Sequence, residues 1–368
     1  MSAAAVRRVV HLDTGREWRG GQAQVHMLIR GLRRHGVESM LLAPDAPLLR
    51  RARAAGVMAE PWDPRFDLDL GAGFAARGMI GAWKPDVVHA HTARAHALGV
   101  PAARIARVPA VVVSRRVAMP VRGGLLGLKY RMPVDRYLCV SRGVLETMAK
   151  GGVPRERLVV VPSGIEPAPS SSIDVRRLLG VASDTLLIGT AAALTAEKRH
   201  RDLLEAFSLV VASTAADVHM VWLGEGPLRE SLERQARALG LEKRVHLLGF
   251  REDARVLIAQ CTMAALASDS EGIATTLIEA QDAGVPVVAT AVGGVPEVVQ
   301  DRVTGRLVPP RDPRAMAGVL TELLNSPEAR AAMGRAGKQA AQEFHIDRTV
   351  ERTLDAYRSA LGAGRSSS

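Results

Sequence analysis

Two glutamates eight residues apart mark the stretch of this sequence whose residue types could do chemistry. Glu271 stands beside a glycine in a predicted loop, and Glu279 follows inside an apolar helical segment. A helix that starts near Thr275 would offer unpaired backbone N–H groups and a positive dipole end, which attract phosphate. An acid among apolar residues needs a polar partner, and sugar or ribose hydroxyls would serve. The spacing alone also fits two solvated glutamates, so the rest of the chain must decide.

Other glycine, basic, aromatic and histidine residues follow further predicted strands. Taken alone, His91 would more often be a core residue, Lys198 would be a solvated lysine, and the Gly224–Pro227 stretch would be a turn. Open α/β sheets bind ligands at the carboxyl ends of their strands, so the joint placement predicts one ligand site. The residues are Gly20, Gly21, His91, Lys198, Gly224, Phe250 and Arg251.

Short apolar strands alternate with helical patterns along the whole chain, which predicts an α/β protein with two doubly wound parallel sheets. Expected strands lie at 6–12, 39–43, 85–91, 110–114, 136–140 and 159–161, and then at 186–191, 219–223, 245–248, 263–266, 287–290 and 306–308. A stretch rich in proline and serine at 167–173 reads as a linker. We therefore expect domains at 1–165 and 166–345, and a disordered tail at 362–368. The first glycine loop lacks the dinucleotide fingerprint, which counts against an NAD-dependent dehydrogenase.

Composition fits a two-domain globular protein of 368 residues with 47% hydrophobic side chains. The two cysteines, Cys139 and Cys261, stand in apolar contexts, which predicts buried thiols in a reducing cytoplasm, without a metal cluster. The first residues do not read as a signal peptide, and no stretch approaches the roughly 18 apolar residues of a membrane span.

Positive charge is concentrated in the N-terminal half. Residues 1–165 hold 26 Lys and Arg against 12 Asp and Glu, a net +14, whereas residues 166–368 hold 23 against 26, a net −3. The segment 114–137 places cations between apolar residues, which suits an anionic membrane surface or an anionic acceptor, and equally a solvated loop. Nucleic acid is the weaker choice because aromatics are only 3%. The candidate acceptor or membrane residues are Arg115, Arg116, Arg122, Lys129 and Arg131.

These motifs together resemble the GT-B glycosyltransferases of glycosyltransferase family 4, a retaining family. The resemblance is densest over 188–309, where the paired glutamates precede Gly-Val-Pro-Val-Val-Ala-Thr and Gly-Gly-Val-Pro-Glu. It implies two Rossmann-like domains facing a central cleft, with the acceptor bound by the first and a nucleotide sugar by the second. It also implies a C-terminal helix, 346–361, that crosses back to the first domain.

The resemblance also assigns roles in the second domain. Glu279 is similar to the acid that holds the donor ribose, and Glu271 to the acid at the transferred sugar. Lys198 is similar to the lysine that neutralises the leaving diphosphate. Gly272 and Ile273 would lie at the sugar hydroxyls, and the diphosphate would lie on the backbone of Ala274, Thr275 and Thr276.

Further roles follow for both domains. Phe250 and Arg251 are placed where the family lines the nucleobase pocket. Gly20 and Gly21 resemble the loop that lets the diphosphate approach the backbone, and His91 resembles the active-site histidine. On this pattern His91 orients or stabilises the sugar and is not a covalent nucleophile.

Three positions depart from the family pattern: Ala193 replaces a frequent arginine, Arg199 a frequent glycine, and Ile273-Ala274 a frequent Phe-Gly. The function expected is metal-independent, retaining hexosyl transfer from a UDP-, GDP- or ADP-sugar, without a further cofactor. The acceptor would be a saccharide or lipid-linked saccharide, as in cell-envelope glycan or lipopolysaccharide synthesis. We expect a cytoplasmic protein, peripheral on the inner face of the cytoplasmic membrane. The alternatives are a nucleotide-sugar epimerase of similar fold and a non-catalytic sugar-binding relative.

Overall fold

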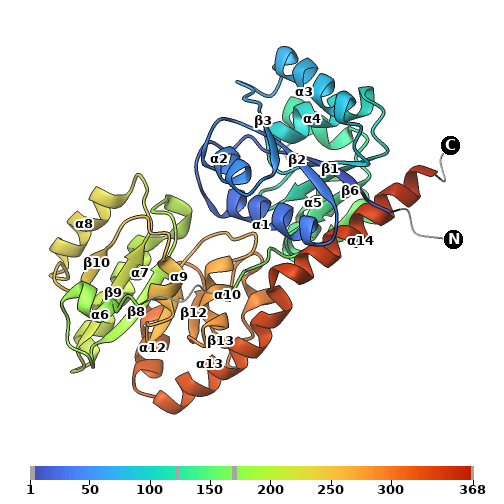
Figure 1. Cartoon of the computed structure of the whole chain (residues 1–368). Coiled ribbons are helices and arrows are strands. Elements are labelled where there is room, and N and C mark those ends of the chain that lie inside the picture. Colours follow the sequence, from blue (N-terminus) through green and yellow to red (C-terminus); the bar gives the residue numbers. More distant parts are fainter. Residues whose placement is uncertain (1–4, 122–123, 168–171, 366–368) are drawn as a thin grey trace. The chain divides into compact units, whose positions relative to one another are not determined.

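The computed structural model describes residues 5–121, 124–167 and 172–365, and it divides into two compact units (Figure 1). Unit 1 holds the residues up to Gly164 together with those from Ile346 onwards. Unit 2 holds Ile165–His345. Each unit has its own sheet and its own core, and each is described by itself.

Unit 1 is built on a seven-stranded parallel sheet in the order β3-β2-β1-β4-β5-β6-β7. Its central strands are valine-rich and buried, as expected when helices cover both faces of a parallel sheet. The strand order reverses between β1 and β4, so the switch point of this sheet lies at their carboxyl ends. The strands are β1 (Arg8–Leu12), β2 (Glu38–Ala43), β3 (Met58–Pro61), β4 (Val87–Ala90), β5 (Ala110–Arg115), β6 (Arg136–Cys139) and β7 (Leu158–Val160).

The helices of unit 1 include one from the C-terminal end of the chain. They are α1 (Gly20–Arg34), α2 (Pro47–Ala54), α3 (Leu70–Trp83), α4 (Ala93–Ile105), α5 (Arg142–Lys150) and α14 (Ile346–Arg365), with short 3-10 turns η1 (Gly124–Arg131) and η2 (Arg155–Arg157). Helix α14 packs on α1, β5 and β6 and buries Val350 and Tyr357 in the core. Gly31 permits this contact, because a Cβ there would lie 2.3 Å from a methyl of Val350.

Unit 2 repeats the plan with a six-stranded parallel sheet in the order β10-β9-β8-β11-β12-β13. Its switch point lies between β8 and β11. The strands are β8 (Leu186–Ala191), β9 (Val218–Leu223), β10 (Val245–Leu247), β11 (Met263–Leu266), β12 (Val287–Thr290) and β13 (Gly305–Val308). The helical segments are α6 (Val175–Leu179), η3 (Ala196–Lys198), α7 (His200–Ser213), α8 (Arg229–Ala238), α9 (Ala254–Ile258), α10 (Thr275–Asp282), α11 (Val295–Val298), α12 (Pro313–Leu324), α13 (Pro327–Ala341) and η4 (Gln342–Phe344).

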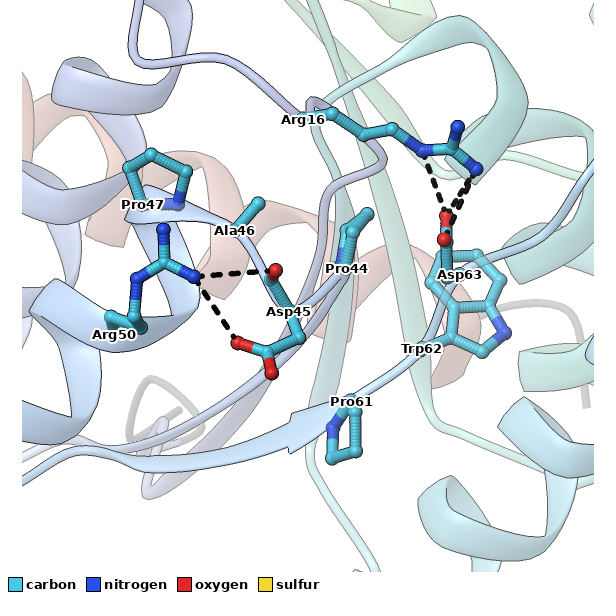
Figure 2. A pocket seen from close by; sticks show the side chains of 9 residues that line it. All are labelled: Arg16, Pro44, Asp45, Ala46, Pro47, Arg50, Pro61, Trp62 and Asp63. Carbon is cyan, nitrogen blue, oxygen red and sulfur yellow. Dashed lines mark hydrogen bonds and ion pairs between the residues drawn. The ribbon is translucent and has the colours of Figure 1, made fainter.

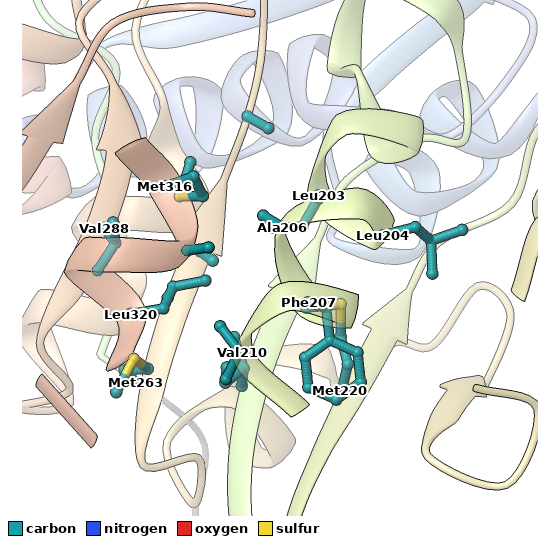
Figure 3. Close-up of a cluster of buried hydrophobic side chains, with 14 of the residues drawn as sticks. Leu203, Leu204, Ala206, Phe207, Val210, Met220, Met263, Val288, Met316 and Leu320 are labelled. Atoms are coloured by element: carbon teal, nitrogen blue, oxygen red, sulfur yellow. The ribbon is translucent and has the colours of Figure 1, made fainter. Parts of the chain in front are cut away.

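A core of aliphatic, sulfur and aromatic side chains fixes the strands that carry the second switch point. Figure 3 shows Phe207 of α7 beside Met220 of β9, and Leu320 of α12 near Val288 of β12. All four side chains are fully buried. Because protein interiors are close-packed, the loops at the strand ends rise from a rigid base.

The predicted fold class is confirmed, and two sequence expectations differ in detail. Strand β3 was not predicted, because it is a short edge strand in which only Ala59 is buried. Helix α14 continues to Arg365, so Gly362–Arg365 are helical where a tail was expected. The predicted linker and tail also include residues 168–171 and 366–368, which lie outside the described part. In the described residues, every helix is too short or too polar to cross a bilayer.

Candidate active site

The switch point of unit 2 brings Lys198 and Glu271 together. Lys198 ends η3 beyond β8, and Glu271 lies in the loop after β11. The Nζ of Lys198 lies 2.6 Å from Oε1 of Glu271, and the Ser268 hydroxyl donates to the same oxygen at 2.6 Å. Only 8% of the Glu271 side chain and 22% of the Lys198 side chain are exposed. The result is a partly desolvated ion pair whose lysine retains access to solvent.

Two tight backbone contacts hold the Glu271 loop. Gly293 has a φ of +51°, and a Cβ there would lie 1.9 Å from the carbonyl oxygen of Glu271. The N–H of Gly294 donates to that oxygen at 3.1 Å. On the other side the Thr290 hydroxyl donates to the Ser268 carbonyl at 2.6 Å. The paired glycines of the Gly-Gly-Val-Pro-Glu motif therefore let the loop after β12 press against the acidic loop.

Helix α10 begins four residues after Glu271, at Thr275. Its N-cap residue is the buried Ala274, which has no side chain to bond the first N–H groups. The backbone N–H of Thr275 points back to the Ile273 carbonyl at 3.2 Å. The helix start therefore presents a positive dipole end without a capping side chain, as an anion-binding terminus would.

Glu279, on the next turn of α10, faces a buried cation that the sequence did not predict. Arg255 of α9 places its Nε 3.5 Å from Oε1 of Glu279 and its Nη2 3.8 Å from Oδ2 of Asp282. Both Arg255 nitrogens are buried and lack a hydrogen-bond partner within the described residues. Burial raises the pKa of Glu279 to about 7, although Arg255 opposes the rise. These polar groups retain unused hydrogen-bonding capacity.

The ends of β9 and β10 form a second tight corner. A glycine is required at position 224, because a Cβ there would lie 2.0 Å from the Ala192 carbonyl oxygen. The N–H of Gly224 donates to the Gly249 carbonyl at 2.8 Å. The ring of Phe250 is 56% exposed. Arg251 is held by Asp253 through bonds of 2.8 and 2.7 Å. The corner thus exposes an aromatic ring and a fixed guanidinium.

One departure from the family pattern has a structural explanation. Arg199 has a φ of +51°, the left-handed conformation in which glycine is favoured. Its guanidinium is bound by Asp202 at 2.9 and 3.0 Å and lies 3.8 Å from Asp269. Arg199 is therefore committed to ion pairs away from the lysine–glutamate pair, and it does not replace the arginine absent at Ala193.

The switch point of unit 1 carries a chain of hydrogen bonds through His91. An Nη2 of Arg116 lies 3.3 Å from Nδ1 of His91, and Nε2 of His91 lies 3.0 Å from Nδ1 of His11. A guanidinium can only donate, so Nδ1 of His91 accepts and Nε2 of His91 carries the proton. His11 must then accept at Nδ1 and carry its own proton on Nε2. For His91 to reach a sugar hydroxyl, one of its two hydrogen bonds must break.

Burial keeps these histidines neutral. It lowers the pKa of His11 to about 3 and the pKa of His91 well below its ordinary value, and the charge of Arg116 adds to both effects. His89 is satisfied on both sides, by the Tyr357 hydroxyl at 2.7 Å and the Ser114 hydroxyl at 2.8 Å. One nitrogen of each histidine lies within 4.8 Å of the others. Five of the six ring nitrogens bond one another, hydroxyls or Arg116, whereas Nε2 of His11 lacks a partner within the described residues. With a guanidinium beside it, the cluster fits a hydrogen-bond network better than a metal.

Asp13 follows β1 at the same edge. Its Oδ1 accepts from the Gly15 N–H at 2.7 Å and from Gln22 at 3.2 Å, whereas Oδ2 is buried without a partner in the described residues. Burial raises the pKa of Asp13, and the charge of Arg116 opposes this. Neither the buried Asp13 nor the bond between Arg116 and His91 was predicted from the sequence.

The other predicted residues of unit 1 have varied surroundings. Gly20 and Gly21 open α1, and a Cβ at either would meet no atom within 4 Å. Arg115 donates to the Tyr130 hydroxyl at 2.9 Å, and Lys129 lies 4.0 Å from Asp67. Arg131 is exposed, and Arg122 lies outside the described residues.

A pocket of about 520 Å³ opens at the carboxyl ends of β2 and β3. Figure 2 shows ion pairs on two sides of it, Arg16 with Asp63 at 2.9 Å and Arg50 with Asp45 at 3.5 Å. Trp62 lies in its wall with an indole N–H that donates to the Ala72 carbonyl at 2.9 Å. The pocket is lined by both charged and apolar side chains and shares the sheet edge that carries His91.

The structure thus unites Lys198 with Glu271 in unit 2, whereas His91, Gly20 and Gly21 belong to unit 1. Sequence reasoning missed Ser268, Arg255 and the residues around His91. Ser268 had a signal, as a hydroxyl directly after β11. Arg255 had none, because its partner lies on a different helix.

Comparison with known proteins matches each of the two units to a family of glycosyltransferases. The model of "Glycosyl transferases group 1" matches residues 173–340, and that of "Glycosyltransferase Family 4" matches residues 18–168. The protein named "Putative glycosyltransferase EpsD" of Bacillus subtilis is 26% identical over 323 residues, 82% of this chain and 83% of that protein. A D-inositol 3-phosphate glycosyltransferase of Salinispora tropica is 36% identical over 52% of this chain and 38% of its own length.

A solved structure has the same fold along nearly the whole chain. Anabaena HepE, in complex with UDP and glucose, superimposes with a TM-score of 0.83 over 95% of this chain and 98% of its own, at 21% identity. The fold, with its two parallel sheets, and the two family matches indicate the same family. The chain belongs to the group 1 glycosyltransferases of family 4, with the GT-B fold.

Proposed function

We propose that this glycosyltransferase takes a hexose from a nucleoside-diphosphate sugar bound by unit 2. The observation that carries the proposal is the Lys198–Glu271 pair beside the uncapped start of α10. A diphosphate needs fixed positive potential, and a lysine and a helix N-terminus supply it. The complex of HepE with UDP and glucose is consistent with such a donor.

The reaction would proceed with retention of configuration. The bond between the sugar carbon and the phosphate oxygen breaks, and the nucleoside diphosphate leaves with the electron pair. The acceptor hydroxyl forms the new bond on the same face, and its proton passes to the leaving phosphate oxygen. Lys198 then stabilises the charge that develops, without a requirement for a metal, while Glu271 accepts hydrogen bonds from the sugar.

Glu279 and Arg255 would meet the nucleoside. A ribose offers two hydroxyls, and the half-buried carboxyl of Glu279 can accept them. The exposed ring of Phe250 offers a face on which a base can stack. The pocket of unit 1 lined by Arg16, Asp45, Arg50 and Asp63 would take the saccharide or lipid-linked acceptor. A role in cell-envelope glycan or lipopolysaccharide synthesis, at the cytoplasmic side, completes the proposal.

Donor binding and turnover test it in two steps. UDP-, GDP- and ADP-sugars are added to the native chain, and the bound donor raises the melting temperature. Release of nucleoside diphosphate is then compared in the native chain and in the double variant Lys198→Met/Glu271→Gln. The double variant removes both charges together, so no buried charge is left unpaired and the fold is preserved.

The proposal predicts one preferred donor and loss of at least about a thousandfold in turnover by the folded double variant. It fails if none of the sugars stabilises the chain. It also fails if the double variant melts as the native chain does and keeps native turnover.

A further inference from the structure

The three most exposed large apolar side chains of the described residues, with a fourth beside them, gather at the entrance to α3. Phe66 is 57% exposed, Leu68 78%, Leu70 71% and Phe74 67%. Scattered exposed apolar residues are ordinary, but four within nine residues are not. A soluble protein that presents such a patch normally covers it with a partner or a membrane.

Helix α3 itself has an apolar outer face. Its fourteen residues contain one charged side chain, Arg77. Ala76 and Ile80 are buried, and α4 is its main packing partner. The outward positions, spaced four apart, are Leu70, Phe74, Gly78 and Ala82. A solvent-facing helix would carry polar residues there. Figure 1 shows α3 at the edge of unit 1, on the outer side of α4.

A second exposed apolar segment is linked to the first through side chains of η1. Asp67 lies 4.0 Å from Nζ of Lys129 in η1, which ties the loop before α3 to η1. Arg115 donates to the Tyr130 hydroxyl of η1 and to the Met119 carbonyl, at 2.9 and 2.6 Å, which ties 117–119 to η1 as well. Val117 is 47% and Met119 53% exposed. We call this patch the α3 surface; it comprises Phe66, Leu68, Leu70, Phe74, Val117 and Met119.

Exposed arginines flank the α3 surface, whereas its acidic side chains face cations or accept hydrogen bonds from backbone N–H groups. Arg65, Arg77 and Arg131 are exposed. Asp67 faces Lys129 and Arg94, at 4.0 and 3.4 Å. Asp69 caps α3 by accepting from the N–H of Ala72 and of Arg65, each at 3.0 Å. The occupant must therefore be apolar at its centre and anionic at its border.

We propose that the α3 surface binds an anionic lipid bilayer. The apolar side chains enter the boundary between headgroups and acyl chains, and the arginines contact lipid phosphates. A second copy of this chain fits less well, because it would bring a like set of cations against Arg65, Arg77 and Arg131. The net +14 of residues 1–165 acts in the same direction. The proposal goes beyond the glycosyl transfer and stands without it.

Vesicle binding by the full chain, without donor or acceptor, tests the proposal. Flotation compares vesicles of phosphatidylcholine alone with vesicles that also contain phosphatidylglycerol. The variants are Leu70→Glu/Phe74→Glu in the patch and Arg77→Gln/Arg131→Gln at its border. The control is Met58→Glu, which adds a charge at an exposed apolar position, 53% exposed, at the amino end of β3. Melting temperatures verify that every variant is folded.

We expect the native chain and Met58→Glu to bind the anionic vesicles, and more weakly at high salt. The patch variant loses at least about tenfold in affinity. Each arginine removed costs about fivefold, the equivalent of about 1 kcal/mol. Absence of native binding overturns the proposal, as does full binding by the folded patch variant. Loss of self-association in the patch variant, measured by sedimentation velocity, would also overturn it, in favour of a second copy. Because donor turnover is assayed separately, failure here leaves the transferase proposal standing.

Discussion

Alanine at Gly293 tests whether the loop after β12 positions Glu271. The left-handed backbone, with φ of +51°, costs an alanine roughly 1–2 kcal/mol. Its Cβ would lie 1.9 Å from the Glu271 carbonyl oxygen, where real contacts reach at least 3.0 Å. The two loops must therefore separate by about 1 Å, and such overpacking costs about 1–3 kcal/mol. The free energy of unfolding should fall by about 2–5 kcal/mol in total.

Thermal unfolding and donor turnover measure the two consequences of Gly293→Ala. At roughly 2–4 °C per kcal/mol, the melting temperature of unit 2 should fall by about 10 °C. Turnover should fall by at least about tenfold below this transition, because Glu271 moves with its carbonyl. The matched control is Gly318→Ala, in the exposed middle of α12 with free space around its Cβ, which should stabilise by about 0.5–1 kcal/mol. Native stability and native turnover in Gly293→Ala would show that the loop after β12 does not position Glu271.

Three further changes probe the remaining polar groups. Burial raises the pKa of Glu279 from 4.5 to about 7, so the folded state favours the protonated acid. The contribution of Glu279 to stability is therefore fully present below about pH 4.5 and is lost as the pH rises through 7. Glu279→Gln should therefore melt like the native chain near pH 5 but be more stable at pH 8, by up to about 3 kcal/mol, in paired thermal scans; equal melting at both pH values would contradict this. Arg116→Gln should remove the donor that fixes His91, and ¹⁵N NMR should show loss of the Nε2–H tautomer there; a native-like ¹⁵N spectrum would count against the network. Tyr357→Phe leaves a buried nitrogen of His89 unpaired and should lower the free energy of unfolding by about 1–3 kcal/mol in urea titrations, whereas an unchanged midpoint would mean that the bond is not important.

The strands of both sheets could be predicted because buried parallel strands are continuous apolar runs bounded by glycine and proline. Leu186–Ala191, Met263–Leu266 and Val287–Thr290 have the bounds expected from sequence. The edge strand β3 could not be predicted, since one buried residue in four gives little hydrophobic pattern. Fold and family were predicted, and the structural match and the family models confirm them.

The candidate site was predictable only where it follows the strand ends. Lys198 and Glu271 are placed by adjacent central strands, β8 and β11, so their meeting follows from sheet topology. The bond between Arg116 and His91 depends instead on the rotamer of a long side chain at the end of β5. That segment was read from its charges as an acceptor or membrane surface. The sequence pattern predicts strand β5, but not the direction in which the guanidinium of Arg116 points.

The most direct test of the central claim is release of nucleoside diphosphate from the preferred nucleotide sugar by the native chain and by Lys198→Met/Glu271→Gln. We expect turnover by the native chain and, in a double variant that melts within a few degrees of it, loss of at least about a thousandfold. Native turnover by that folded double variant would mean that Lys198 and Glu271 do not carry the transfer.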